Sequence, residues 1–225
     1  MPAPRRKLHV PPTHRFRFLL GCLLLIVLGY PYLDATRIDS DVFYGILVVT
    51  SIGALYAAAA ERRMVRVGTA LTVPMIIGMW WPLESAAPLR HVGLVCEAAL
   101  FFLVAFAIGR QVLRNEEVTE DTLSGAACVY LFLGLAWTAL YLLIEERHPG
   151  SFTFKATQTR PAEMIWPDLL YFSFTTLTTT GYGDICPLSD QARSVALLEH
   201  MIGVLYIAIV VARLVALYRA PARNG

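Results

Sequence analysis

Several kinds of coordinating oxygen meet in one short segment, residues 179–184, which reads TTGYGD. Gly181 and Gly183 stand at alternate positions, and glycine adopts left-handed backbone angles at little cost. A strand with that freedom can aim successive carbonyl oxygens inward, where carbonyls from several chains replace the hydration shell of a cation. Thr179 adds a hydroxyl at one end, and we expect the ring of Tyr182 to pack outward. The segment therefore predicts cation coordination by backbone oxygens.

A short apolar stretch, residues 167–178, precedes this segment and predicts the element that positions it. Pro167 with the adjacent Asp168 is typical of a helix start. At 1.5 Å per residue such a helix covers roughly 16 Å, about half of a hydrocarbon core. The five residues 179–183 span at most about 17 Å when extended, enough to lead the chain back towards the surface from which it entered. We therefore expect a half-helix that enters the membrane and a strand that returns, an arrangement that survives only where it is buried or lines a water-filled path.

Long apolar runs surround these elements and place the chain in the membrane class. Of its 225 residues, 56% are hydrophobic and 16% are charged, against about 25% charged in a soluble domain. The expected fold class is all-α integral membrane, with six transmembrane helices, a re-entrant pore helix and an extended filter. The six predicted spans, each close to the length that a membrane requires, are 16–33, 42–60, 67–83, 91–110, 124–144 and 192–217.

Basic residues give the expected orientation. Cytoplasmic loops carry an excess of Lys and Arg, and with the N-terminus inside, 13 of the 19 basic residues fall on that side. We therefore expect a multi-pass plasma-membrane protein, surrounded by lipid, with both termini in the cytoplasm. The expected divisions are a cytoplasmic N-terminus 1–15, a four-helix membrane domain 16–110, a cytoplasmic linker 111–123, a pore domain 124–218 and a cytoplasmic C-terminus 219–225.

Residues 176–184, TLTTTGYGD, resemble the TxTTxGYGD filter of the potassium channels, whose TVGYG loop is the general example of carbonyl coordination. The resemblance covers the C-terminal part of the chain strongly, and the first four spans only in organisation, as in six-span, one-pore channels. It implies passive, selective K+ conduction by a homotetramer, with K+ ions in the filter and no other cofactor. It implies a filter of Thr179, Thr180, Gly181, Tyr182 and Gly183, with K+ at the first four, supported by Asp184, Tyr171 and Thr175. Asp184 is expected to be braced by Tyr171.

The fourth predicted span departs from the voltage-gated members of that family. A voltage sensor carries arginine repeatedly along this span, and residues 91–109 contain none. We therefore expect no strong voltage dependence, and we also expect no cytoplasmic regulatory domain. Gly203 in the sixth span matches the family's gating-hinge glycine, and its alternative role is close helix packing.

Two acids fall inside predicted spans, where ionisable side chains are costly. Glu97 lies in the fourth span and Glu199 in the sixth. Each is either a proton-sensitive or gating group, or a buried carboxyl bonded to a neighbour. For Glu199 we expect the bonded carboxyl, against the back of the pore helix near Thr175 or Thr176. For Glu97 both interpretations stay open.

The sequence contains no recognisable catalytic grouping, metal-ligand spacing or phosphate-binding glycine loop, so we do not expect an enzyme. Nucleic acid and small-molecule substrates are not expected as partners. Alternatives to a selective channel stay open: because Thr180 replaces the commonest valine or isoleucine, a weakly selective cation channel is one. A potassium transporter subunit and a non-conducting modulatory subunit are others, although the intact GYG in a single pore loop argues against both. The gating stimulus is not specified.

Overall fold

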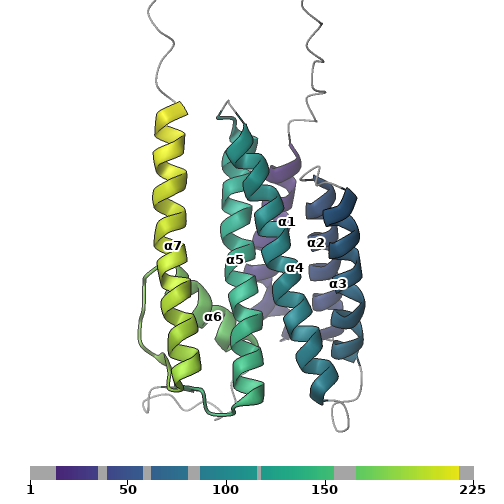
Figure 1. Cartoon of the computed structure of the whole chain (residues 1–225), viewed down its shortest axis with the longest axis vertical. Helices are drawn as coiled ribbons and strands as arrows, with labels where there is room; N and C mark the ends of the chain where they lie inside the picture. The colour runs from purple at the N-terminus through teal and green to yellow at the C-terminus, as the bar shows by residue number, and fades with distance from the viewer. Residues whose placement is uncertain are drawn as a thin grey trace, which may run out of the picture.

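The computed structural model describes residues 14–34, 40–57, 62–80, 87–115, 118–154 and 166–217. Over these residues the chain forms seven helices and two short strands (Figure 1). In chain order they are α1 (Arg15–Asp34), α2 (Ser40–Ala57), α3 (Arg62–Trp80), α4 (Ala87–Arg114), α5 (Glu120–Arg147), β1 (Phe152–Phe154), α6 (Trp166–Leu177), β2 (Ile185–Pro187) and α7 (Asp190–Leu217).

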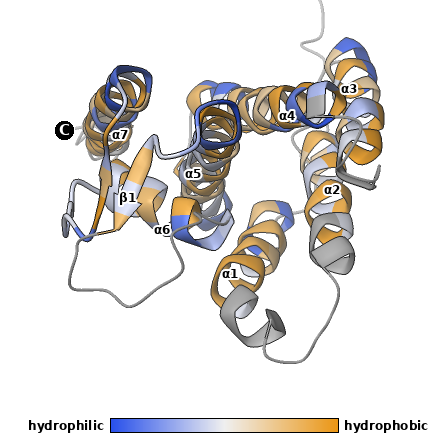
Figure 2. Cartoon of the chain, turned by 90° about the horizontal axis from the view of Figure 1, so that it is seen from below, coloured by the Kyte–Doolittle hydropathy of each residue, from blue (hydrophilic) through white to orange (hydrophobic). Residues whose placement is uncertain are grey.

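The helix α5 is central to the fold. It packs along α4 and also contacts α1, α6 and α7, while α3 packs on α4. In Figure 1 α7 stands at one edge and α2 and α3 stand towards the other, and Figure 2 shows from below that α5 lies between α4 and α6. Phe101 of α4 and Phe132 of α5 meet in the core with ring centroids 6.1 Å apart. The core thus joins α5 to the N-terminal helices on one side and to α6 and α7 on the other.

The helices follow the predicted spans closely. The pore helix predicted at 167–178 is α6, and the span predicted at 192–217 is α7. Because α4 and α5 extend beyond their predicted ends, the linker predicted at 111–123 shortens to residues 115–119. Residues 116 and 117 within it, and the predicted ends at 58–60 and 81–83, lie outside the described residues.

Within the described part of the chain, three helices are long and apolar enough to cross a membrane. They are α4, α5 and α7. The helices α1, α2 and α3 coincide with the other predicted spans, and their passage through the membrane stays a prediction. The described fold is therefore mostly helical and suited to a membrane.

The strands β1 and β2 pair antiparallel, a feature that the all-α prediction missed. Phe152 lies opposite Pro187 in this register. The Glu145 carboxylate, near the end of α5, accepts hydrogen bonds from the backbone N–H groups of Gly150 and Phe152 at 2.9 and 3.1 Å, and so directs the chain from helix into strand. Three-residue strands are too short to show the alternation that identifies a strand in sequence. The small sheet ties the chain before α6 to the chain after the filter.

The first turns of α1 and α5 meet at one end of the molecule. One carboxylate oxygen of Asp121 accepts hydrogen bonds from the backbone N–H groups of Phe16 and Arg17, at 3.0 and 3.3 Å. Arg17 also pairs with Glu120. The first amides of a helix lack partners within it, and its positive dipole end favours a carboxylate. Asp121 therefore caps a helix other than its own and fixes α1 on α5.

We expect Asp121→Ala to lower the free energy of unfolding by about 1 kcal/mol, because two amides of α1 lose their acceptor. Thermal unfolding of the purified protein in detergent measures this change. Glu120→Gln is the matched control, since Glu120 is exposed and exposed ion pairs contribute about 0–1 kcal/mol. Equal stability of the two variants would mean that this junction does not hold α1.

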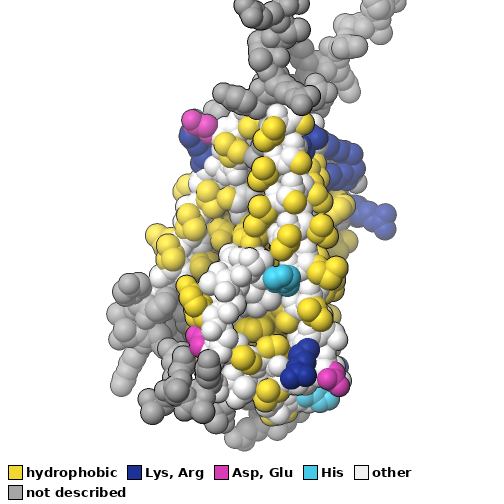
Figure 3. All heavy atoms as spheres, turned by 90° about the vertical axis from the view of Figure 1, so that its left-hand side faces the viewer, with side chains coloured by type: hydrophobic (Ala, Val, Ile, Leu, Met, Phe, Trp, Pro, Cys, Tyr) yellow, Lys and Arg dark blue, Asp and Glu magenta, His cyan; other side chains and the backbone are white. Residues whose placement is uncertain are grey.

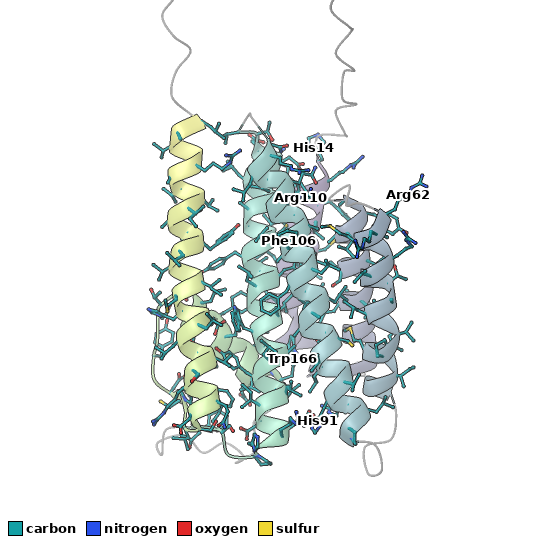
Figure 4. All side chains as sticks on the ribbon, viewed as in Figure 1. His14, Arg62, His91, Phe106, Arg110 and Trp166 are labelled. Carbon is teal, nitrogen blue, oxygen red and sulfur yellow. The ribbon has the colours of Figure 1, made fainter. Side chains whose placement is uncertain are left out.

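The same end of the molecule carries several described basic residues that were predicted on the cytoplasmic side. Figure 4 places Arg62 and Arg110 towards the end where α1 begins, near His14, and His91 at the opposite end. At the first of these ends Arg213 of α7 donates to the Asn115 carbonyl at 3.0 Å. These three arginines, which the sequence assigned to one side of the membrane, thus lie at one end of the molecule.

The helix α7 exposes apolar side chains along its length (Figure 3). Only 17% of its most apolar 18-residue stretch is buried within the chain, against 61% for the same length of α5. The exposed side chains include Leu197, Leu198, Met201, Val204, Leu205, Ile207, Ile209, Val211 and Val215. Contiguous apolar surface of this kind marks contact with a partner or with lipid.

Candidate functional site

The helix α6 is short and lies between α5 and α7. Its 12 residues cover about 18 Å, so it cannot cross a hydrocarbon core of about 30 Å. Pro167 and Asp168 stand in its first turn, where a missing N–H costs little and a carboxylate meets the positive dipole end. Leu169, Phe172 and Leu177 are buried. Packing against the two long helices therefore fixes where α6 ends.

The end of α6 passes directly into the filter segment through a C-terminal cap. The Thr180 N–H donates to the Thr175 carbonyl at 2.9 Å, and the Thr179 N–H donates to the Thr176 carbonyl at 3.0 Å. Together with a left-handed Thr179, this is the Schellman arrangement that ends many helices. The Thr175 carbonyl also accepts from the Gly181 N–H at 3.1 Å. Thr175 therefore contacts the filter through its backbone, while its hydroxyl donates to a carbonyl of its own helix at 3.0 Å.

Positive φ angles alternate along the filter segment. They are 61° at Thr179, 52° at Gly181 and 71° at Gly183. Alternating right- and left-handed residues turn successive N–H groups to one side of a chain, which leaves the carbonyls to the other side. For the β-branched Thr179 the left-handed conformation costs about 1–2 kcal/mol. Such strain persists where the surroundings impose it, commonly at functional sites.

The C-terminal end of the filter segment is braced by Tyr171. Its hydroxyl donates to Oδ2 of Asp184 at 2.8 Å, and Oδ1 of Asp184 accepts from the Ile185 N–H at 3.1 Å. The rings of Tyr171 and Tyr182 stack with centroids 6.3 Å apart and planes 4° from parallel. A phenol with a pKa near 10 stays protonated at neutral pH, so the donor is permanently available. The expected bond between Tyr171 and Asp184 is thus present.

The C-terminal end of α6 has a partner that the sequence did not indicate. The Tyr130 hydroxyl of α5 donates to the Leu177 carbonyl, the last of α6, at 2.8 Å. Tyr130 stacks on Tyr206 of α7, whose hydroxyl donates to the Ala126 carbonyl at 2.6 Å. Tyrosines inside apolar spans were the available signal, because a buried hydroxyl requires a partner.

Gly203 of α7 lies against the end of α6. A Cβ at this position would overlap the Leu177 carbonyl oxygen and approach Cδ1 of Leu177 at 3.1 Å. A glycine here therefore permits the backbones of α6 and α7 to approach closely, the packing role considered from the sequence. The hinge role of Gly203 stays a prediction.

Glu199 reaches the back of α6, two to three residues before the predicted contact. The expected partners were Thr175 or Thr176. Instead its carboxyl oxygens lie 2.5 Å from the Tyr141 hydroxyl and 2.6 Å from the Ser173 hydroxyl. Glu199 therefore belongs to the environment of the pore helix.

Glu97 is not brought to this site. It is buried in α4, and among the described residues its Oε1 has no hydrogen-bond partner. Two turns away Arg90 pairs with Glu146 of α5 at 2.6 Å. Both interpretations of Glu97 stay open.

Comparison with known proteins shows which proteins this part of the chain is similar to. Residues 130–220 match the ion channel family, a range that begins within α5 and contains α6, the filter and α7. The chain is similar to two pore potassium channel c of Oryza sativa subsp. japonica, with 36% identity over 87 residues, which are 39% of this chain and 18% of that protein. Similarity to the potassium channel protein kcv of Paramecium bursaria Chlorella virus 1 is 29% over 82 residues, which are 36% of this chain and 82% of the viral protein.

Over its C-terminal part the chain is therefore similar to ion channels, and the similar proteins are potassium channels. A third similar protein, the inward rectifier potassium channel Kirbac3.1 of Paramagnetospirillum magnetotacticum, is 31% identical over 87 residues, which are 39% of this chain and 25% of that channel. The matched proteins are ion channels and not enzymes. No solved structure matches the chain at the same level of significance. The helices α1 to α4 precede the range that matches the ion channel family.

Proposed function

We propose that the chain is one subunit of a potassium-selective channel that conducts K+ passively down its gradient. The observation that carries this proposal is the alternation of positive φ at Thr179, Gly181 and Gly183 within the sequence TTGYGD. It supports a row of K+ sites made by the carbonyls of Thr179, Thr180, Gly181 and Tyr182, with the Thr179 hydroxyl at the inner end. The negative dipole end of α6, which leads into this row, favours a cation.

Four copies are proposed to surround the pore. One filter segment cannot enclose an ion, and the family resemblance gives four. The exposed apolar surface of α7 supports contact with neighbouring copies and with lipid. The proposed subunit has six spans in the plasma membrane, with both termini cytoplasmic.

The proposed channel opens without steep voltage dependence. Residues 91–109 of α4 contain no arginine, whereas a voltage sensor moves several charges through the membrane field. Arg90, just before this range, is paired with Glu146. That pairing supports a structural role for the one arginine near the outer end of α4.

Cys186 gives the proposed orientation a direct test. It lies in β2 just after the filter, half-buried, with its sulfur 3.5 Å from the Gly183 carbonyl oxygen. A membrane-impermeant thiol reagent added outside is expected to react with Cys186 and reduce K+ flux, and the same reagent added inside is expected to do neither. Cys186→Ser is the control. A reaction only from the inside would reverse the proposed orientation.

Tyr171→Phe is expected to shorten the time for which the filter stays conducting. The change removes the bond to Asp184 but keeps the ring against Tyr182, so about 1 kcal/mol is lost at the outer end of the filter. Current recordings should show faster decay of the K+ current while selectivity during the first openings stays normal. Tyr56→Phe, an exposed tyrosine on α2, is the control. An unchanged decay in Tyr171→Phe would mean that the brace does not support conduction.

A weakly selective cation channel is the second candidate, because Thr180 replaces the commonest aliphatic residue. The Thr180 hydroxyl lies 2.9 Å from the Thr178 hydroxyl, so it is already partnered within the chain. That contact favours the selective channel, with Thr180 acting through its branched shape.

Reconstitution of the purified protein in liposomes tests the proposed function. We expect K+ efflux through the purified protein alone, much slower Na+ efflux, and little change when the membrane potential is varied. Equal K+ and Na+ efflux would favour the weakly selective channel. The absence of any flux would contradict a conducting subunit.

A further inference from the structure

The side chain of Glu199 lies wholly inside the protein where three helices meet. Its exposed fraction is 0%. Its Oε2 contacts the Tyr141 hydroxyl of α5, and its Oε1 contacts the Ser173 hydroxyl of α6. The same Ser173 hydroxyl lies 2.9 Å from the Gly134 carbonyl oxygen of α5. Four groups on three helices thus form one continuous chain of polar contacts behind the pore helix.

The number of protons in this chain decides how it is arranged. Three close oxygen–oxygen contacts require three protons, and Tyr141 and Ser173 supply one each. With an ionised Glu199, Ser173 would have one proton for two acceptors, and one contact would bring two acceptors together. With a proton on Glu199, Tyr141 donates to Glu199, Glu199 donates to Ser173, and Ser173 donates to Gly134. Every contact is then a hydrogen bond, and no unpaired charge is buried within the membrane.

The helices α7 and α6 make two contacts that are spaced by one helical turn on each helix. Glu199 and Gly203 are four residues apart on α7, and they meet Ser173 and Leu177, four residues apart on α6. Between them on α6 lies Thr175, whose carbonyl accepts hydrogen bonds from the N–H groups of Thr180 and Gly181 in the filter segment. A displacement of α6 at Ser173 would therefore also move the Thr175 carbonyl and the filter amides bonded to it.

We propose that Glu199 is a positioning residue that acts as a neutral carboxylic acid. It holds the pore helix on α7 through Ser173 and thereby keeps the filter in its selective conformation. Tyr141 orients the carboxyl, and Gly134 accepts the last proton in the chain. This inference rests on the proposed K+ conduction and adds a residue outside the filter that determines its selectivity.

Substitutions of Glu199 test whether it acts as a hydrogen-bond donor or as a negative charge. Glu199→Gln keeps the shape, an N–H donor towards Ser173 and a carbonyl acceptor for Tyr141. Its ratio of K+ to Na+ flux is expected to stay within about twofold of wild type. Glu199→Ala removes both contacts, and its ratio is expected to fall roughly tenfold. A Glu199→Gln variant as unselective as Glu199→Ala, or a Glu199→Ala variant as selective as wild type, would overturn the proposal.

Two further variants keep the test valid if Glu199→Ala does not fold. Ser173→Ala breaks the same chain with a smaller change and is expected to lower the flux ratio in the same direction. Tyr206→Phe is the matched control, because it removes another hydrogen bond between α7 and α5 without touching Glu199. Equal effects of these two variants would overturn a specific role of the chain.

Infrared spectroscopy tests the proton itself and does not depend on conduction. The difference spectrum between wild type and Glu199→Gln is expected to contain the carbonyl stretch of a protonated carboxyl, present only in wild type. A difference spectrum that contains the bands of a carboxylate instead would overturn the neutral acid. Failure of the proposed function is distinguishable, since wild-type protein would then carry no selective K+ flux whatever the infrared result.

Discussion

Gly181→Ala is expected to abolish potassium selectivity. The φ of Gly181 is 52°, and a left-handed conformation costs a residue with a Cβ about 1–2 kcal/mol. A Cβ there would meet no atom of the chain within 4 Å, so the cost is one of backbone conformation and not of space. If the residue relaxes to negative φ, the neighbouring peptide units turn and K+ loses a carbonyl ligand. A loss of about 1.4 kcal/mol in discrimination is already tenfold in the ratio of K+ to Na+ permeability.

Gly150→Ala is the matched control for this prediction. Gly150 has a φ of 85° and also has no atom within 4 Å of an added Cβ, but it lies in the turn between α5 and β1. It carries a similar backbone cost outside the filter. We expect lower thermal stability with normal selectivity. Similar loss of selectivity in both variants would attribute the effect to general destabilisation, and normal selectivity in Gly181→Ala would mean that the alternation of φ is unnecessary.

Gly203→Ala is expected to destabilise the protein and to reduce K+ flux. The new methyl group overlaps the Leu177 carbonyl oxygen, which is backbone at the end of α6. Overpacking of this kind costs about 1–3 kcal/mol, and here it pushes α7 away from the helix that carries the filter. Thermal unfolding in detergent and liposome flux measure the two consequences.

Gly21→Ala distinguishes this packing effect from flexibility alone. Gly21 lies within α1, and a Cβ there meets nothing within 4 Å, so alanine is expected to stabilise that helix by about 0.5–1 kcal/mol. If Gly203 served only as a hinge, Gly203→Ala would also raise stability and would change only channel opening. Raised stability of Gly203→Ala would therefore contradict the close-packing role.

The short helix α6, the backbone angles of the glycines after it and the bond between Tyr171 and Asp184 could be predicted because their signals are local. Pro167 and Asp168 indicate where α6 begins, and the glycines at alternate positions indicate the backbone angles that follow. The left-handed Thr179 was not predicted, because threonine disfavours this conformation and only the cap on Thr175 and Thr176 imposes it.

Contacts between helices could not be predicted to the residue. For Glu199 the sequence indicated a contact with α6 but placed it two to three residues, roughly 3–4.5 Å, too far along that helix. Periodicity does not specify how two helices are offset along their axes. The bond of Tyr130 to Leu177 and the capping of α1 by Asp121 were missed for the same reason. Both join residues far apart in the sequence.

The reversal potential of the purified channel, with K+ on one side of a planar bilayer and Na+ on the other, tests the central claim most directly. If TTGYGD forms a row of carbonyl sites for K+, the potential lies far from zero in the direction set by K+ permeability. A reversal potential near zero would contradict selective conduction by this filter.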